Sequence, residues 1–315
     1  MLCRSLEYWL TPFRVPGVKG KRKMCSWHLV SHRRPRRGTL VQGLEPEFLR
    51  FRSARLKSCP DTSWRAAIIN ILTSFPVLSI VIPAYNEEKR LPPTLEAIRD
   101  YLDSGPFAEA EILVVDDGSG DRTPEVVETL AREDPRVRLL RNPGNRGKGY
   151  AVRHGMLEAR GEWILFSDAD MSAPIGELSL LLDAARARNA AIAIGSRALD
   201  RSLIGVHQSR WREASGIFFN RVMRVVTGLP FADTQCGFKL YRRDAARAVF
   251  PLQRLDGFGF DVEDLYIARI WHIPAIEVPV RWNNVEGTKV SLMHGLRSFS
   301  DLLLVRWNHL CGRYR

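Results

Sequence analysis

Cysteine is scarce in this sequence, with five residues among 315 and no Cys-x-x-Cys pair. The chain therefore lacks the spacing of a disulfide scaffold or a zinc knuckle, and a reducing compartment fits it best. Its seven histidines show no pairing at the spacing of metal ligands. Apolar residues make up 45% and charged residues 26%, which excludes a wholly disordered, collagen-like or coiled-coil chain.

The chain also lacks a long apolar run. Its most apolar stretch, residues 66–83, is interrupted by Pro76 and by polar side chains at positions 70, 73, 74 and 79. A transmembrane helix needs roughly 20 consecutive apolar residues, so none is predicted. No apolar segment follows the first basic residues, which argues against a secretory signal. We expect a protein that is either soluble or bound to a membrane surface.

Acidic residues are almost missing from the first 60 positions. This segment holds 14 Lys and Arg against three acids, so it carries nearly all of the net charge of +12. The rest of the chain is close to neutral, which argues against nucleic-acid binding by the folded body. We expect residues 1–77 to be a basic N-terminal extension. It is a disordered tail, a stretch added by an upstream start codon, or a tail attracted to anionic lipid.

From residue 78 onward, apolar segments alternate with amphipathic ones. The apolar segments predict strands at 78–82, 111–115, 137–140, 162–166 and 191–194. The amphipathic segments between them predict helices, of which the first two are opened by prolines at positions 92, 93 and 124. Strands that are apolar throughout and alternate with helices indicate an α/β fold with a mostly parallel sheet, flanked by helices on both faces.

Acidic residues gather where these strands end, which is the edge at which parallel sheets bind ligands. Asp116 and Asp117 follow the second strand, and Asp168 and Asp170 follow the fourth. In extended backbone, residues two apart point the same way, so Asp168 and Asp170 would repel without a cation between them. Their oxygens suit Mg²⁺ or Mn²⁺, which complete their shell with water and phosphate oxygens. The pattern predicts a nucleotide-diphosphate site; a helix-capping role for Asp170 is the alternative.

Two other nucleotide motifs are incomplete. The segment 118–123 lies between a strand and a helix as a dinucleotide-binding loop would, but threonine replaces its third glycine and two aspartates precede it. Gly147 and Lys148 resemble the end of a P-loop, but glycine follows the lysine where Ser or Thr is required. The sequence therefore favours neither a dehydrogenase nor a P-loop ATPase.

Five segments together resemble the family 2 glycosyltransferases, which have the Rossmann-like GT-A fold. They are 81–87 (VIPAYNE), 115–119 (VDDGS), 145–149 (NRGKG), 168–170 (DAD) and 195–197 (GSR). The resemblance implies a GT-A domain over residues 78–290.

Three later segments are similar to the dolichyl-phosphate β-glucosyltransferase branch of that family. They are 233–239 (DTQCGFK), 260–263 (FDVE) and 280–289 (VRWNNVEGTK). This branch moves glucose from UDP-glucose to a polyprenyl phosphate with inversion. Its eukaryotic members have an N-terminal membrane helix, where this chain has a basic segment. The similarity implies the same substrates, a Mg²⁺ or Mn²⁺ cofactor, no nucleic-acid partner, and a peripheral place on the cytoplasmic side of a membrane.

The resemblance also implies roles for individual residues. The uracil and ribose of the donor would be lined by Pro83, Tyr85, Glu87 and Asp117, with Asp116 nearby in the nucleotide-sugar site. Asp168 and Asp170 would be catalytic through the metal and the diphosphate. Arg197 would be catalytic through the acceptor phosphate, and either Arg210 or Arg212 would provide a second acceptor contact.

Five further positions have open or weaker assignments. Lys148 either reaches a donor phosphate or lies in a simple turn. Asp261 and Glu263 either contact the donor sugar or are ordinary acids at a helix N-terminus. Gln235 and Lys239 flank a glycine that allows close backbone approach; the resemblance places Gln235 at the donor and Lys239 at the acceptor phosphate.

The C-terminal residues 291–315 predict an amphipathic helix, because apolar side chains recur at helical intervals from position 292 to 307. It either packs on the core or rests on the membrane that holds the lipid acceptor. The predicted function is a metal-dependent inverting glycosyltransferase. The enzymatic alternative uses another nucleotide sugar, such as GDP-mannose, or another acceptor. The non-enzymatic alternative is a basic membrane or nucleic-acid adaptor, which the charge distribution disfavours.

Overall fold

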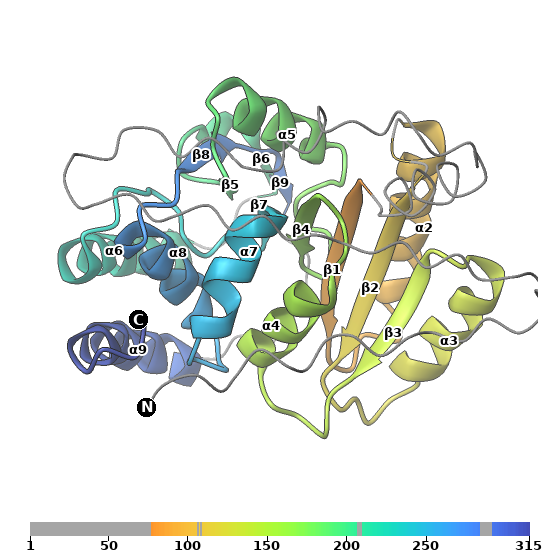
Figure 1. The fold of residues 1–315 in the computed structure, drawn as a ribbon, viewed down its shortest axis with the longest axis horizontal. Coiled ribbons are helices and arrows are strands. Elements are labelled where there is room, and N and C mark those ends of the chain that lie inside the picture. Colours follow the sequence, from red (N-terminus) through yellow and green to blue (C-terminus); the bar gives the residue numbers. More distant parts are fainter. Residues whose placement is uncertain (1–76, 106, 108, 207–209, 284–291) are drawn as a thin grey trace, which may run out of the picture. The chain divides into compact units, whose positions relative to one another are not determined.

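The computed structural model describes residues 77–105, 107, 109–206, 210–283 and 292–315. The expected N-terminal extension lies outside these residues except for Val77. The central element is a seven-stranded sheet with the order β3-β2-β1-β4-β7-β5-β8 (Figure 1). Its strands are β1 Leu78–Ala84, β2 Ala110–Asp116, β3 Val137–Arg141, β4 Trp163–Ser167, β5 Ile192–Ser196, β7 Phe238–Arg242 and β8 Ala275–Pro279.

The prediction of a mostly parallel sheet is confirmed. Strands β3, β2, β1 and β4 pair in parallel, and β5 pairs in parallel with β8. Strand β7 was not predicted; it runs antiparallel between β4 and β5. Its insertion brings the segment that follows position 230 against the carboxyl ends of β4 and β5, where the sequence places its acidic and basic motifs.

Helices cover both faces of the sheet, as expected for strands that are apolar throughout. On one face, Ile80 and Ile82 of β1 pack with helices α2 Leu91–Ser104, α3 Thr123–Glu133 and α5 Glu177–Ala187. On the other face, Val81 packs with a second group of helices. These are α4 Lys148–Glu158, α6 Arg210–Thr227, α7 Arg243–Val249, α8 Phe260–Ile270 and α9 Leu292–Leu310.

Helix α4 lies unusually close to the sheet because residue 155 is glycine. A Cβ there would lie 2.4 Å from Val81 Cγ1 and 2.8 Å from Val115 Cγ2. The close packing holds the N-terminus of α4, which begins at Lys148, over the carboxyl ends of β1 and β2. The remaining short elements are η2 Arg201–Leu203, β6 Ile204–Val206, η3 Phe250–Leu252 and β9 Trp282–Asn283, of which β6 and β9 pair with each other.

The predicted C-terminal helix is α9. Leu302 and Val305 are buried in the core shared with α6 and α8. Leu303 and Trp307 point outward and are exposed. One face of the helix therefore packs on the core as one interpretation predicted, and a second apolar face remains at the surface. Among the helices that the structure describes, none is long and apolar enough to cross a bilayer.

Candidate active site

The segment Asp168 to Asp170 leaves the end of β4 and is held from both sides. The backbone N–H of Asp168 donates to the carbonyl of Gly237 at 3.0 Å. The hydroxyl of Thr94 donates to the carbonyl of Ala169 at 2.8 Å. Residue 237 must be glycine for this contact, because a Cβ there would lie 2.0 Å from Asp168 Oδ2. The glycine that the sequence suggested for close approach thus supports the Asp168 carboxylate.

Lys148 pairs directly with this carboxylate. Its Nζ lies 2.7 Å from Asp168 Oδ1, with 23% of the lysine side chain and 32% of the aspartate side chain exposed. Burial disfavours the charged amine, but the carboxylates of Asp168 and Asp261 outweigh it and raise the pKa of Lys148. Lys148 is the first residue of α4, so the simple-turn interpretation does not hold. A positive charge therefore stands at the Asp168 carboxylate.

Asp168 and Asp170 suit a divalent cation. Both carboxylates are partly exposed, and the hydrogen bonds from the backbone and hydroxyl of Ser172 both reach Oδ1 of Asp170, at 3.0 and 2.9 Å. Across the described part of the chain, no group of three or more His, Cys, Asp or Glu side chains converges as a metal cage. Mg²⁺ or Mn²⁺ commonly takes one or two carboxylates from the protein and fills its remaining coordination positions with water and phosphate oxygens. The two carboxylates here match that requirement.

Arg197 follows β5 and is fixed by Asp233. Its Nε and Nη2 donate to the two carboxylate oxygens of Asp233 at 2.7 and 2.8 Å, and its backbone N–H donates at 3.1 Å. The guanidinium also lies 5.5 Å from the ring centre of Trp282. Burial disfavours the charge on Arg197, but attraction to the Asp233 carboxylate outweighs burial and raises the pKa of Arg197. Burial also disfavours the charge on Asp233, but attraction to Arg197 outweighs it and lowers the pKa of Asp233. Within the described residues, Nη1 has no assigned hydrogen bond.

Asp233 was missed in the sequence analysis as a functional residue. It lies in the quoted segment 233–239, but nothing in the spacing indicates that it meets an arginine 36 residues earlier. Its own position depends on Glu277 of β8, which accepts hydrogen bonds from the backbone N–H groups of Ala232 and Asp233 at 2.9 and 2.8 Å. Gln235 is half-buried, and its backbone N–H donates to Asp233 at 3.2 Å.

Asp261 lies behind Lys148 in a buried ion pair with Lys239. Lys239 is fully buried, with the rings of Phe166 and Phe260 each 5.6 Å from its ammonium. Burial opposes its charge, and the carboxylates of Asp261 and Asp264 raise its pKa. Lys239 was predicted at the acceptor phosphate; the structure instead buries its ammonium and pairs it with Asp261.

Glu263 is also fully buried. Its Oε2 accepts from the backbone N–H groups of Arg254 and Leu255 at 2.9 and 2.7 Å, and its Oε1 accepts from the hydroxyl of Tyr314 at 2.5 Å. Burial raises the pKa of Glu263 despite these donors. The structure gives this carboxylate a role in holding the loop before α8 rather than the expected contact with a sugar.

The aspartates at the end of β2 organise a neighbouring loop. Asp117 is buried and accepts from the side chain of Asn142 at 2.7 Å and from the backbone N–H groups of Arg146 and Gly147 at 3.1 and 2.7 Å. Asp116 is buried and accepts from the backbone of Ser119 at 3.2 Å. Asp117 thereby fixes the residues that lead directly into Lys148.

Three other residues predicted for the nucleotide lie at the end of β1. Pro83 is half-buried and Tyr85 is exposed. The side chain of Glu87 forms an ion pair with Arg90 at 3.6 Å, and the backbone N–H of Glu87 donates to the Thr123 hydroxyl at 2.8 Å. Their backbone thus lies beside the β2 loop. The structure brings the β1, β2 and β4 motifs to one edge of the sheet.

Arg210 and Arg212 lie in the first turn of α6, but their side chains fall outside the described residues. The structure therefore does not choose between Arg210 and Arg212 as the second contact to the acceptor phosphate.

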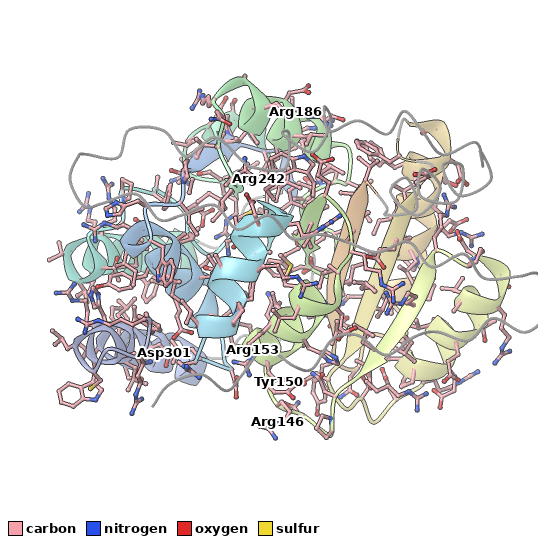
Figure 2. All side chains as sticks on the ribbon, in the orientation of Figure 1. Arg146, Tyr150, Arg153, Arg186, Arg242 and Asp301 are labelled. Atoms are coloured by element: carbon pink, nitrogen blue, oxygen red, sulfur yellow. The ribbon has the colours of Figure 1, made fainter. Side chains whose placement is uncertain are left out.

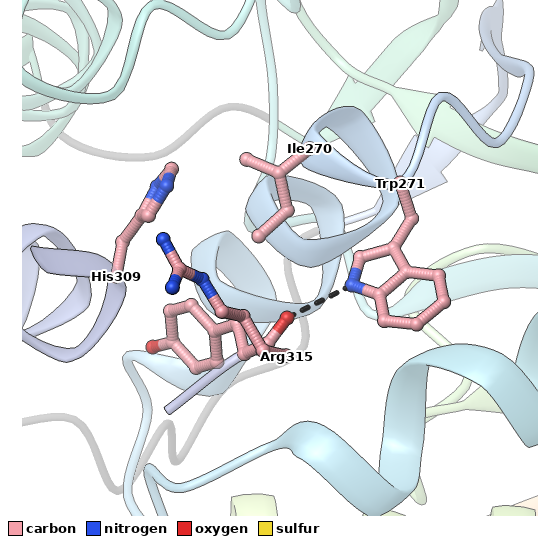
Figure 3. A pocket seen from close by; sticks show the side chains of 5 residues that line it. Ile270, Trp271, His309 and Arg315 are labelled. Carbon is pink, nitrogen blue, oxygen red and sulfur yellow. Dashed lines mark hydrogen bonds between the residues drawn. The ribbon is translucent and has the colours of Figure 1, made fainter. Parts of the chain in front are cut away.

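A pocket of about 420 Å³ lies at the far end of α8 and α9 (Figure 3). It is lined by Ile270, Trp271, His309, Tyr314 and Arg315. The indole N–H of Trp271 donates to the backbone carbonyl of Tyr314 at 3.0 Å. None of the residues predicted for the donor or acceptor lines this pocket, so it is separate from the site at the sheet edge.

The sequence also matches a known protein family and known proteins. A family model described as Glycosyl transferase family 2 matches residues 79–250, from β1 into η3. The dolichyl-phosphate beta-glucosyltransferase of Homo sapiens is 37% identical over 251 residues, covering 76% of this chain and 77% of that protein. A dolichyl-phosphate beta-glucosyltransferase of Trichomonas vaginalis is 38% identical over 237 residues, 72% of each chain.

Solved structures show the same fold at lower identity. Glucosyl-3-phosphoglycerate synthase from Mycobacterium tuberculosis, in complex with phosphoglyceric acid, has a TM-score of 0.54 at 18% identity, covering 73% of this chain and 80% of that one. The same enzyme with Mn²⁺ and UDP-glucose has a TM-score of 0.53 at 16% identity, covering 76% and 82%. The predicted GT-A architecture is confirmed.

Proposed function

This chain belongs to glycosyl transferase family 2, and from that membership we propose that it transfers glucose from UDP-glucose to a polyprenyl phosphate of the dolichol type, with inversion. Its identity as a glycosyltransferase follows from the family. The glucose and the dolichyl phosphate are supported by the names of relatives that match about three quarters of the chain. The proposal places the enzyme peripherally, on the cytoplasmic side of a membrane.

The proposed reaction is a single displacement. A phosphate oxygen of the lipid forms a bond to the anomeric carbon of glucose, the bond from that carbon to the β-phosphate oxygen breaks, and UDP leaves. Attack and departure take place on opposite faces of that carbon, which inverts its configuration. The phosphate is already an anion at neutral pH, so the step needs little help from a general base. The residues must instead reduce the repulsion between two anions.

The donor half of the site is assigned to the β1, β2 and β4 ends. Pro83, Tyr85 and Glu87 would line the uracil and ribose. Asp116 and Asp117 are buried, so they would act by shaping the loop that faces the nucleotide. Gln235 remains assigned to the sugar side. Asp261 is buried in its ion pair with Lys239, so it would act from behind Lys148 and not by touching the sugar.

Asp168 and Asp170 would hold Mg²⁺ or Mn²⁺, as their partly exposed side chains allow. The ion, when bound, offsets the negative charge of the departing UDP. Mn²⁺ together with UDP-glucose in a solved structure of the same fold is consistent with this assignment. Lys148 already pairs with Asp168 and would add a second positive charge beside the diphosphate.

The acceptor half is assigned to Arg197, with Arg210 or Arg212. Asp233 occupies one edge of the Arg197 guanidinium and fixes its plane, which leaves Nη1 for a phosphate oxygen. Arginine suits phosphate because its planar fork places several donors at once. The observation that carries the proposal is that one short segment holds both groups. The carbonyl of Gly237 accepts from the backbone N–H of Asp168 at 3.0 Å, and Asp233, four residues earlier, accepts from Arg197 Nε at 2.7 Å, so the proposed cation site and anion site adjoin.

The test uses the purified full chain with Mg²⁺ or Mn²⁺, a short polyprenyl phosphate, and a panel of UDP-glucose, UDP-galactose, UDP-N-acetylglucosamine and GDP-mannose. We expect UDP-glucose to give the highest kcat/KM, a β-linked lipid product, and loss of turnover with excess EDTA. Preference for GDP-mannose would identify the alternative donor. An α-linked product would refute the inverting displacement.

A further inference from the structure

Helix α9 has two apolar faces, and only one of them is used by the core. Leu302 and Val305 are buried. On the outward side, Leu303 is 65%, Trp307 is 59% and Leu310 is 75% exposed. These three positions lie three or four residues apart, so they form one stripe along the helix. Burying a large apolar side chain is favourable, and a stripe of three at the surface indicates a contact surface.

The stripe is bordered by positive charge. From residue 302 to the last residue the chain contains Arg306, Arg313 and Arg315 and no acidic residue, and all three arginines are exposed. Helix α6 packs against α9 through the rings of Phe219 and Phe299, whose centres are 5.1 Å apart. The surface is therefore amphipathic, with apolar and tryptophan side chains in the middle and guanidinium groups along its edge.

Helix α6, which packs against α9, has exposed side chains of the same kinds. Arg221 and Arg224 are exposed, and Val225 next to them is 85% exposed. Basic and apolar side chains are thus exposed on the neighbouring helix as well. The pocket at the end of α8 adds Trp271, which is exposed close to the chain end (Figure 3).

This surface is connected to the active site by a short path. Asp301 of α9 lies against Gly259, where a Cβ would meet the aspartate at 2.5 Å. The ring of the adjacent Phe258 lies 5.7 Å from the ammonium of Lys148, which pairs with Asp168.

In the view of Figure 2, the N-terminal end of α4 lies on the same side of the molecule as Asp301. Arg153 pairs with Asp256 at 2.9 Å, and the backbone N–H of Tyr150 donates to the Asp256 carbonyl at 3.2 Å. Figure 2 shows Asp301, Arg153, Tyr150 and Arg146 in this region. Arg146 and Arg153 lie 4.9 and 5.0 Å from the Tyr150 ring. Arg146, Tyr150 and Arg153 thus form a basic and aromatic group at the N-terminus of α4, which carries Lys148.

We propose that Leu303, Trp307 and Leu310, with the arginines that border them, insert into the headgroup region of an anionic lipid bilayer. The inference deepens the proposed function, because the acceptor in that reaction is itself a membrane lipid. Anionic headgroups complement the arginines, and the upper acyl region accepts the apolar stripe. A second copy of the chain, or its own basic residues 1–60, would instead bring like charges together.

The test is co-sedimentation of the full chain with phosphatidylcholine vesicles that contain about 30% phosphatidylserine. Salt near about 0.5 M screens attraction that rests on charge alone, including that of the basic N-terminal residues. The variant combines Leu303→Ser, Trp307→Ser and Leu310→Ser. The matched control combines Leu180→Ser and Leu199→Ser, which are 50% and 49% exposed elsewhere on the surface.

We expect the wild type and the control to remain bound at high salt, and the triple variant to bind at least about a hundredfold more weakly. Trp307→Ser alone should weaken binding in the same direction, and it provides a second variant with a smaller effect on folding. Binding of the triple variant equal to the wild type would overturn the proposal. An equal loss of vesicle binding in the control variant would also overturn it. The same holds if the wild type is a dimer and the triple variant is a monomer that binds vesicles as well as the wild type does.

The vesicle measurement contains no nucleotide sugar and no polyprenyl phosphate, so it does not depend on the reaction. Turnover of the triple variant with a short, water-soluble polyprenyl phosphate should match the wild type. If vesicle binding behaves as expected but UDP-glucose is not used, the proposed function fails and the membrane surface stands. If transfer proceeds and high-salt binding is unaffected by the triple change, the membrane surface fails alone.

Discussion

The hydroxyl of Tyr314 donates a hydrogen bond of 2.5 Å to Oε1 of Glu263. Glu263 in turn accepts from the backbone of Arg254 and Leu255, in a loop that packs on α4. Gln253 joins the same loop to α4 by donating to the carbonyl of Gly149 at 2.9 Å. The last residues of the chain are thereby connected to the helix that presents Lys148.

Tyr314→Phe should destabilise the fold. The change removes the Tyr314 hydroxyl and leaves the buried carboxylate of Glu263 with one hydrogen-bond donor fewer. We expect the free energy of unfolding to fall by about 1–3 kcal/mol. Urea unfolding measures this loss. Tyr150→Phe is the control, because no hydrogen bond is assigned to the Tyr150 hydroxyl within the described residues. Equal stability of Tyr314→Phe and the wild type would contradict the structural role of this contact.

Gly237→Ala should reduce turnover more than stability. A Cβ at this position would lie 2.0 Å from Asp168 Oδ2, so the carboxylate must swing away from its place beside Lys148. We expect kcat to fall at least about tenfold, since misplacing a catalytic group by about 1 Å is enough for such a loss. Gly257→Ala is the matched control, because nothing lies within 4 Å of a Cβ there. Unchanged kcat in Gly237→Ala would show that Asp168 needs no fixed position.

Asp170→Asn should abolish transfer and leave the fold intact. The amide keeps the size of the side chain but removes the charge that would hold a divalent cation, so we expect kcat/KM to fall at least about a hundredfold. Initial rates and thermal unfolding are measured together. Asp183→Asn, on the exposed side of α5, is the control. Full activity of Asp170→Asn, or of the wild type in excess EDTA, would refute the proposed metal site.

Arg197→Ala should raise the KM for polyprenyl phosphate about ten- to a hundredfold, because a charge-assisted contact to phosphate is lost. The KM for UDP-glucose should change little. Arg186→Ala, an exposed arginine on α5 labelled in Figure 2, is the control. A change confined to the nucleotide sugar would place Arg197 in the donor half of the site.

Asp264 should make stability depend on pH. Burial raises its pKa to about 7, against an ordinary value of 3.8. A raised pKa of an acid stabilises the folded state at low pH, and this contribution is lost as the pH rises from about 4 to about 7. The loss is at most about 1.4 kcal/mol per pH unit.

Urea unfolding of Asp264→Asn across this range is the measurement. The variant cannot ionise at this position, so its free energy of unfolding should fall less steeply with pH than that of the wild type. Asp183→Asn is the control and should retain the wild-type slope. Parallel curves for the wild type and Asp264→Asn would contradict the raised pKa.

Much of the architecture was determined locally by the sequence. All five predicted strands are present, because mostly apolar runs of four or five residues favour burial in a sheet and are too short for buried helices. Helices α2 and α3 have prolines in their first turns, as expected from the fixed φ of proline. The carboxyl ends of parallel strands share one edge, so the convergence of the acidic motifs also followed from order alone.

Tertiary structure decided which of those motifs face a ligand and which face each other. Lys239 and Glu263 carry charge and were expected at the substrates, yet both are buried against partners far away in the sequence. Asp233 became important through Arg197, which lies 36 residues away. Such pairings depend on the antiparallel insertion of β7 and on the packing of α9. Charge and spacing along a chain say that a group needs a partner, but only three-dimensional packing selects the partner.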